Sequence, residues 1–198
     1  LSSPILKIGV DTQFISRIGD DKMGNEILDT LKKFNFDSTL IQEDNKYNTG
    51  EVNVSLDKSK SANYIIKYPC AWDYIALEDS MIATVSKSQA FIFGSLIARS
   101  EESYNTLLTL LKSASFKVFD VNLRPPHFKI NVIEELMQQA DFIKFNDEEL
   151  FEICASLQFH SKDLQKNILF ISKHTNTHLI CVTLGKNGAI IYSDKTFS

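Results

Sequence analysis

The sequence has 198 residues, of which 43% are hydrophobic, and a formal net charge of −4 from 21 basic and 25 acidic side chains. This length and hydrophobic content fit one globular domain with a sizeable core. The two signs of charge are interspersed, which argues against a nucleic acid or an anionic membrane surface as the partner. No apolar run approaches the ~20 residues that span a bilayer and no signal peptide is visible, so we expect a cytoplasmic protein without membrane contact.

The cysteines and histidines do not form a metal or redox motif. Cys70, Cys154 and Cys181 are scattered without CxxC spacing, and we interpret them as reduced core or surface residues. His174 and His178 are separated as on one helical face. However, residues 175–177 have the pattern of a loop, so the sequence does not predict a helical metal pair.

The first third of the chain predicts a strand at 12–18, a turn at 19–24 and a helix that ends near Phe34. Asp20 or Asp21 would cap that helix and complement its dipole, or alternatively shape a nearby site. Residues 50–57 and 63–68 predict two strands joined by a polar loop, since hydrophobic and polar residues alternate there. These strands precede the regular strand–helix units, although an edge hairpin of the main sheet remains an alternative. Trp72 is interpreted as a packing residue.

From residue 91 onward the pattern alternates between strands and helices. Such alternation predicts βαβ units with right-handed crossovers and a mostly parallel sheet with helices on both faces, which is an α/β fold. The predicted strands are 91–93, 116–121, 141–145 and 178–183. The predicted helices are 100–111, 130–138, 147–157 and 161–174.

The stretch DVNLRPPHF, residues 120–128, follows a short apolar run and ends the strand predicted there. Its polar side chains Asp120, Asn122 and Arg124 alternate, so they project to one side if the backbone stays extended. Open α/β sheets bind ligands at the carboxyl ends of their strands, and the planar guanidinium of Arg124 suits phosphoryl and hydroxyl oxygens. We expect Asp120 to orient its neighbours. A structural clamp between Arg124 and an acid such as Asp120 is the alternative.

Two later strands end in comparable polar stretches. The strand at 141–145 ends at Asn146, and the acids that follow would favour a helix N-terminus on electrostatic grounds alone. The strand at 178–183 ends in TLGKNGA, where glycines permit positive φ and a close approach to a ligand. Taken alone, that stretch is compatible with any β-turn, and it is not a Walker loop.

Together, and in this order, DVNLRPPHF, KFNDEEL and VTLGKNGA resemble the ribokinase-like (PfkB) carbohydrate kinases, and the first motif is similar to the fructokinase branch. The resemblance implies a ribokinase-like sheet with helices on both faces, plus a small β lid at about residues 50–70. It implies that residues 1–198 are a single, incomplete kinase domain. The implied reaction is transfer of the γ-phosphoryl group of ATP to a sugar hydroxyl, with fructose as the sugar.

The resemblance also assigns residues and ligands. Asn122 and Arg124 would contact the substrate and its phosphate, and Glu149 would organise Mg²⁺ indirectly, through water. A monovalent cation is a further expected ligand, and the lid is an expected homodimer surface. The residues expected to line the ATP site are Asn146, Glu149, Thr183, Gly185 and Gly188.

Two family elements are not found in these residues, namely a Gly-rich sugar-binding segment and the GAGD-type element that carries the general-base Asp. We therefore expect the catalytic base outside this sequence and expect a polypeptide of these residues alone to be inactive and poorly stable. LSSPILK does not have the pattern of the helix expected before GVDTQF, which suggests a join in the chain between Leu1 and Ile8. The alternatives are another ribokinase-like sugar or nucleoside kinase, or a non-catalytic sugar- or nucleotide-sensing module.

Overall fold

The computed structural model describes residues 10–56 and 62–198, which form two compact units. The first unit ends at Met81, and the second comprises Ile82–Ser198. The join expected between Leu1 and Ile8 lies outside the described residues.

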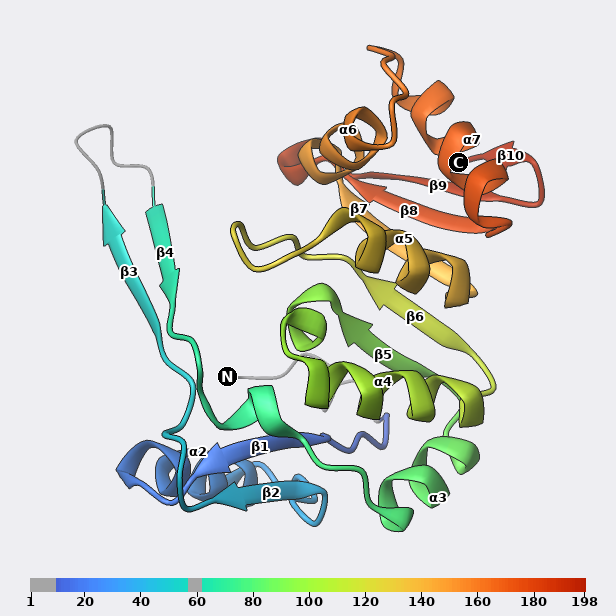
Figure 1. Ribbon diagram of the computed structural model, residues 1–198. Coiled ribbons are helices and arrows are strands. Elements are labelled where there is room, and N and C mark those ends of the chain that lie inside the picture. Colours follow the sequence, from blue (N-terminus) through green and yellow to red (C-terminus); the bar gives the residue numbers. More distant parts are fainter. Residues whose placement is uncertain (1–9, 57–61) are drawn as a thin grey trace. The chain divides into compact units, whose positions relative to one another are not determined.

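In the first unit a helix connects the two strands of a short parallel pair (Figure 1). β1 (Ser16–Gly19) pairs with β2 (Ile41–Asp44), and α2 (Lys22–Lys33) connects them. The strand predicted at 12–18 therefore begins later, because only Ser16 to Gly19 find backbone partners on β2 and Gln13 forms an isolated bridge. The helix and its acidic cap are confirmed, since Asp21 is the N-cap of α2.

β3 (Val52–Leu56) and β4 (Ala62–Ile66) form an antiparallel two-stranded ribbon, separate from the other sheets. The register places Val52 opposite Ile66. The predicted separate hairpin is thus confirmed, and the alternative of an edge hairpin in the main sheet is wrong. Its role as a lid stays a prediction.

The root of the ribbon is packed against a short 3-10 helix, η1 (Ala71–Tyr74). The amide of Ala71 donates to the carbonyl of Asn48 at 2.9 Å. A Cβ at Gly50 would lie 2.0 Å from Nε1 of Trp72, so only glycine leaves room for the indole there. Trp72 therefore packs against the chain, as predicted.

In the second unit six strands form one sheet in the order β10-β9-β8-β7-β6-β5. The four strands β5 to β8 are parallel, whereas β9 and β10 are antiparallel to their neighbours. The mostly parallel sheet is confirmed. The strands are β5 (Phe91–Gly94), β6 (Lys117–Asp120), β7 (Phe142–Asn146), β8 (Leu179–Thr183), β9 (Ala189–Ser193) and β10 (Thr196–Phe197).

Helices alternate with these strands as the pattern predicted, and α3 (Asp79–Lys87) leads into β5. A 3-10 helix, η2 (Ser95–Arg99), follows β5 and precedes the first long helix. The helix predicted at 161–174 begins only at Leu164, because the Asp163 side chain caps it by accepting the amide of Lys166. The long helices are α4 (Glu101–Ser113), α5 (Ile130–Gln139), α6 (Asp147–Ser156) and α7 (Leu164–Thr175).

Helices α4 to α7 all contribute to one core on one side of the sheet (Figure 1). Phe119, Ile143 and Ile180 point into that core and are fully buried. Cys181 and Lys144 occupy alternate positions on β8 and β7 and are partly exposed on the opposite side of the sheet. Helices on both faces of the sheet were predicted, but α4 to α7 cover one face only, and the opposite side exposes Ile92 and Ile191 together with the polar residues near the carboxyl edge.

Candidate functional site

The carboxyl ends of β5 to β8 lie at one edge of the sheet, because these strands are parallel. The register pairs Gly94 with Asp120 and Asn146 with Thr183. The three polar stretches singled out in the sequence are therefore brought together at one edge of one compact unit. In open α/β sheets, this edge is where ligands bind.

The backbone turns sharply directly after β6. Asn122 has φ +45°, the left-handed region, so the chain is not extended and the expected projection of Asp120, Asn122 and Arg124 to one side is wrong. Asparagine tolerates this conformation better than most residues, which is a physical reason for its place there. The carboxylate of Asp120 instead turns to Lys144 on β7, with Oδ1 2.7 Å from Nζ.

The turned segment is held by main-chain and side-chain hydrogen bonds from its neighbours. Val121 donates its amide to the carbonyl of Lys144 at 3.0 Å and accepts the amide of Ser95 at 3.1 Å. The Ser95 hydroxyl donates to the carbonyl of Asn122 at 3.0 Å. The amide of Leu123 donates to Oε1 of Glu149 at 3.0 Å. Residues from β7, η2 and α6 thus fix the chain on both sides of Asn122.

Arg124 follows this held segment and is exposed. Its Nη1 donates to the carbonyl of Leu123 at 2.8 Å, a contact that leaves most of the guanidinium donors available. Asp120 is paired with Lys144, so the clamp between Arg124 and Asp120 is not formed. The arrangement offers a planar cation at the carboxyl edge of β6.

Asn146 and Glu149 form a reciprocal capping box at the start of α6. Oδ1 of Asn146 accepts the amide of Glu149 at 2.8 Å, and Oε2 of Glu149 accepts the amide of Asn146 at 2.9 Å. Glu149 is only 5% exposed, and each of its oxygens accepts one backbone amide. Asp147 and Glu148 complete an acidic first turn, as the helix dipole favours.

The stretch after β8 forms a tight turn into β9 through the short helix η3 (Gly185–Asn187). Gly185 has φ +56° and Gly188 φ +91°, so both glycines adopt conformations that side chains disfavour. The amide of Leu184 donates to the carbonyl of Gly188 at 2.8 Å, and the Thr183 hydroxyl donates to the carbonyl of Phe145 at 3.2 Å. This turn is exposed, and its backbone is open to a ligand.

Asp21 in the first unit forms a network of its own. Its carboxylate accepts the amide of Gly24 at 2.8 Å and the amide of Thr49 at 2.7 Å. Partial burial opposes ionisation, but the backbone hydrogen bonds from Thr49 and Gly24 outweigh it and hold the pKa of Asp21 below its ordinary value. These contacts support the capping interpretation of Asp21.

No group of three or more potential metal ligands occurs among the residues that the structure describes. Mg²⁺ usually keeps several waters and needs few protein carboxylates. His174 pairs with Glu134, with Nε2 2.6 Å from Oε1. Cys70, Cys154 and Cys181 form no disulfide among the described residues, and burial raises the pKa of Cys154 to about 12, as expected of a core thiol.

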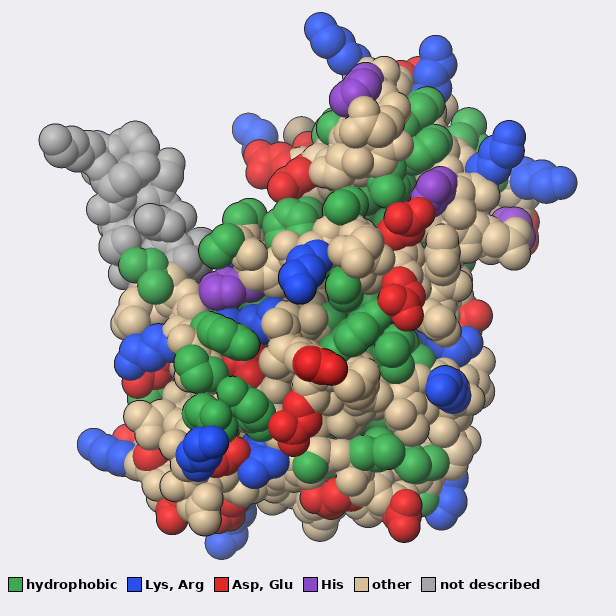
Figure 2. Space-filling model, in the orientation of Figure 1, with side chains coloured by type: hydrophobic (Ala, Val, Ile, Leu, Met, Phe, Trp, Pro, Cys, Tyr) green, Lys and Arg blue, Asp and Glu red, His purple; other side chains and the backbone are tan. Residues whose placement is uncertain are grey.

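The sequence did not predict the roles of Ser95 and Lys144, which hold Asp120 and the segment after β6 in place by hydrogen bonds. Ser95 directly follows a strand, and Lys144 is a lone charge at an alternate position in an apolar one. Both were signals of special positions. Figure 2 shows charges of both signs spread over the visible surface, in keeping with the interspersed charge of the sequence. Among the described residues, no helix has the length and apolar character to cross a membrane.

The parallel strands and their polar carboxyl edge define an α/β protein with the kind of ligand-binding edge that open sheets have. Residues 4–198 match the description "pfkB family carbohydrate kinase", and the chain belongs to this family. The chain spans between 50% and 64% of the length of the curated relatives described next.

Two relatives illustrate the range of similarity. A protein of Pyrococcus horikoshii, described as the uncharacterized sugar kinase PH1459, is 31% identical over 155 residues, which cover 74% of this chain and 50% of that protein. Its structure in complex with ATP has a TM-score of 0.81, covering 98% of this chain and 62% of that one. The fructokinase of Salmonella typhimurium is 23% identical over 203 residues, which cover 98% of this chain and 64% of that protein.

A solved fructokinase of Vibrio cholerae O395, with fructose, ADP and calcium bound, shares the fold with a TM-score of 0.80. Its sequence identity is 21%, and the match covers 98% of this chain and 64% of that one. At this identity the likeness shows the fold alone, so the residue roles rest on the geometry above.

Proposed function

We propose that the full-length protein is an ATP-dependent sugar kinase that transfers the γ-phosphoryl group of ATP to a sugar hydroxyl, with fructose as its acceptor. The observation that carries the proposal is the convergence of three polar stretches, after β6, β7 and β8, at one sheet edge. Related structures support it, since one holds ATP and another holds fructose and ADP.

In this proposal the residues that follow β6 and those that follow β8, on the two sides of the edge, bind different ligands. Asn122 and Arg124 contact the sugar and the transferring phosphoryl group, where a planar fork of donors suits phosphoryl oxygens. The turn of Gly185 and Gly188 with Thr183 lines the nucleotide, because exposed backbone amides can approach phosphates closely. Asn146 lies between the two sides, as its register with Thr183 indicates.

A magnesium ion and a monovalent cation would complete the site. Magnesium would neutralise charge on the phosphates. Glu149 would act on that ion only indirectly: each of its oxygens already accepts one amide, and a second lone pair on each remains for a water. The general base is assigned to no residue of this sequence.

We extend the proposal to the ribbon β3–β4, as a lid over the sugar and as a surface for a second copy of the chain. Val52 is 54% exposed and Ile65 57% exposed on this ribbon. Exposed apolar side chains on a two-stranded sheet suit both tasks, since a lid must exclude water and a dimer surface must bury apolar area. The protein is proposed to act in the cytoplasm.

The test is a coupled ADP-release assay with the full-length protein and a panel of sugars and nucleosides. We expect fructose to give a kcat/KM at least about tenfold above the other acceptors, a margin that one well-matched hydrogen bond provides. A preference for a nucleoside or another sugar would favour a different specificity within the family. Ligand binding without any turnover, in a protein that carries the missing elements, would favour a sensing module.

A further inference from the structure

The segment 121–123 is irregular backbone at the carboxyl edge. Four hydrogen bonds join it to β7, η2 and α6: two with backbone groups of Lys144 and Ser95, one from the Ser95 hydroxyl and one to the Glu149 carboxylate. Val121 and Leu123 are buried, whereas Arg124, the next residue, is exposed. The backbone is therefore fixed immediately before Arg124, whose side chain is exposed to solvent.

This anchoring opposes a local conformational cost. A non-glycine residue at φ +45° is in a sparsely populated region, and such a residue persists only where its surroundings determine it. The two side-chain contacts act on either side of Asn122, because Ser95 binds its carbonyl and Glu149 binds the amide of the next residue. Together they select the turned conformation over an extended one.

Glu149 is unusual as a helix-capping residue. A carboxylate that caps a helix end is normally solvated on its other side, but Glu149 is only 5% exposed. Burial of a charge is costly unless it is hydrogen-bonded, and its second oxygen finds the Leu123 amide, 26 residues away in sequence. One buried side chain thus joins the start of α6 to the loop after β6.

We infer that Ser95 and Glu149 are positioning residues that hold the main chain at 121–123 so that Asn122 and Arg124 face the reacting groups. This inference rests on the proposed function for the roles of Asn122 and Arg124. In addition to the indirect role toward magnesium proposed above, it assigns Glu149 an effect on the phosphoryl group that is transmitted by the backbone.

The first test needs no activity. The amide of Leu123 donates to no backbone carbonyl among the described residues, so its protection against hydrogen exchange must come from Glu149. In the wild-type protein we expect slow exchange at Leu123 by NMR. In Glu149→Gln, whose amide can accept only one of the two N–H groups, exchange at Leu123 or Asn146 should accelerate roughly tenfold or more. Exchange at Leu123 as fast as in an unstructured peptide would overturn the inference, even if the protein is no kinase.

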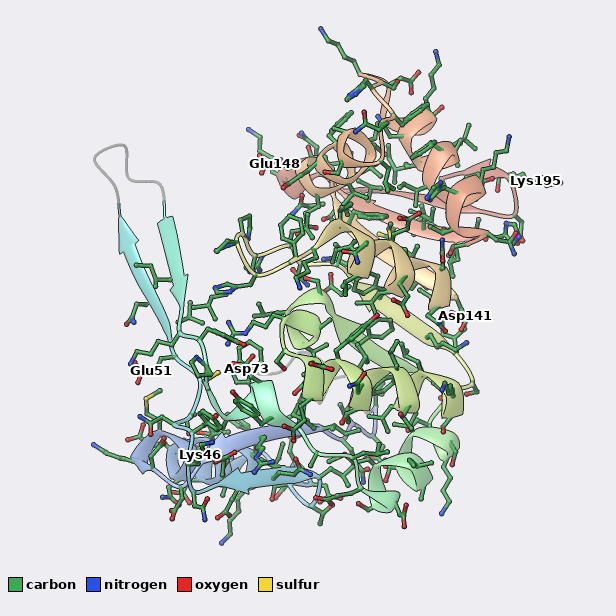
Figure 3. The ribbon with its side chains drawn as sticks, viewed as in Figure 1. Lys46, Glu51, Asp73, Asp141, Glu148 and Lys195 are labelled. Atoms are coloured by element: carbon green, nitrogen blue, oxygen red, sulfur yellow. The ribbon has the colours of Figure 1, made fainter. Side chains whose placement is uncertain are left out.

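The second test is kinetic and separates positioning from a metal role. Glu149→Gln and Ser95→Ala should each lower kcat several-fold at saturating Mg²⁺, and their losses should not add to that of Arg124→Lys. The controls are Glu148→Gln, on the exposed side chain labelled in Figure 3, and Ser115→Ala, which removes a similar hydroxyl-to-carbonyl bond elsewhere. Losses that vanish at high Mg²⁺, or that add fully to Arg124→Lys, would overturn the inference and leave Glu149 with only its proposed water-mediated role toward magnesium.

Discussion

Each unit contains one carboxylate that caps a helix and also binds a loop distant in sequence. Asp21 caps α2 and accepts the amide of Thr49, and Glu149 caps α6 and accepts the amide of Leu123. The two differ in burial, since Asp21 is half-buried and Glu149 is buried. They also differ in the residue that follows the amide donor in the sequence. Thr49 precedes Gly50 at the root of the ribbon, whereas Leu123 adjoins Arg124 at the sheet edge.

We infer from these contacts that the same local chemistry serves different purposes in the two units. In both, an acid at the start of a helix accepts backbone amides that have no partner within the helix. Stability is expected to depend on Asp21, and turnover on the loop that Glu149 holds. Substitutions can therefore separate a structural clamp from one that supports a site.

The largest effect is expected from Arg124→Lys. This substitution tests the role of the guanidinium that follows the segment 121–123 held by Glu149. Lysine keeps the charge but loses the planar fork, and we expect turnover of the full-length kinase to fall about a hundredfold, as when a key transition-state donor is removed. The exposed side chain makes little contribution to packing, so the unfolding temperature should hardly change. Steady-state kinetics with a thermal melt checks both, and activity within twofold of the wild type would refute the role of Arg124.

The next effect concerns Asn146, the partner of Glu149 in the capping box. Asn146→Ala should raise the concentration of Mg²⁺ or ATP that gives half-maximal rate by about tenfold, with a smaller change in the sugar KM. Loss of the cap should also cost stability of about 1 kcal/mol. Titration of each ligand in turn is the measurement. A change confined to the sugar KM would place Asn146 on the other side of the edge.

Much of this arrangement was predictable from the sequence, because it depends on local patterns. The strand–helix alternation after residue 91 and the cap at Asp21 follow from periodicity and capping chemistry. The location of Arg124 at the carboxyl end of β6 was predicted, but the hydrogen bonds that hold the preceding segment were not. The bond from Glu149 to Leu123 joins residues 26 apart in sequence, and only the pairing of β6 with β7 brings them together. The left-handed turn at Asn122 was missed because Asn-Leu-Arg is equally compatible with extended backbone.

A smaller effect is expected from Asp21→Ala, which removes the clamp of the first unit. The amides of Gly24 and Thr49 lose their acceptor, and we expect the free energy of unfolding to fall by about 1–2 kcal/mol. Asp20→Ala is the matched control, since Asp20 is exposed and its main chain alone bonds to β2. Chemical denaturation measures both. Equal losses in the two variants would contradict the special role of Asp21.

The smallest expected effect is a pH dependence of the stability that the Asp21 carboxylate contributes. Burial opposes ionisation of Asp21, but the amides of Thr49 and Gly24 lower the pKa of its carboxyl in the folded state. A carboxyl with a lower pKa when folded stabilises the protein above its unfolded pKa, which is about 3.9, and loses that contribution as the pH falls through the folded value. We therefore expect the stability difference between the wild type and Asp21→Asn to be constant from about pH 7 to about pH 5 and to shrink below about pH 4. Urea titrations of both proteins at each pH provide the measurement, with Asp20→Asn as the control that shows no such trend. A difference that persists unchanged in acid would mean that the shape of the cap matters and its charge does not.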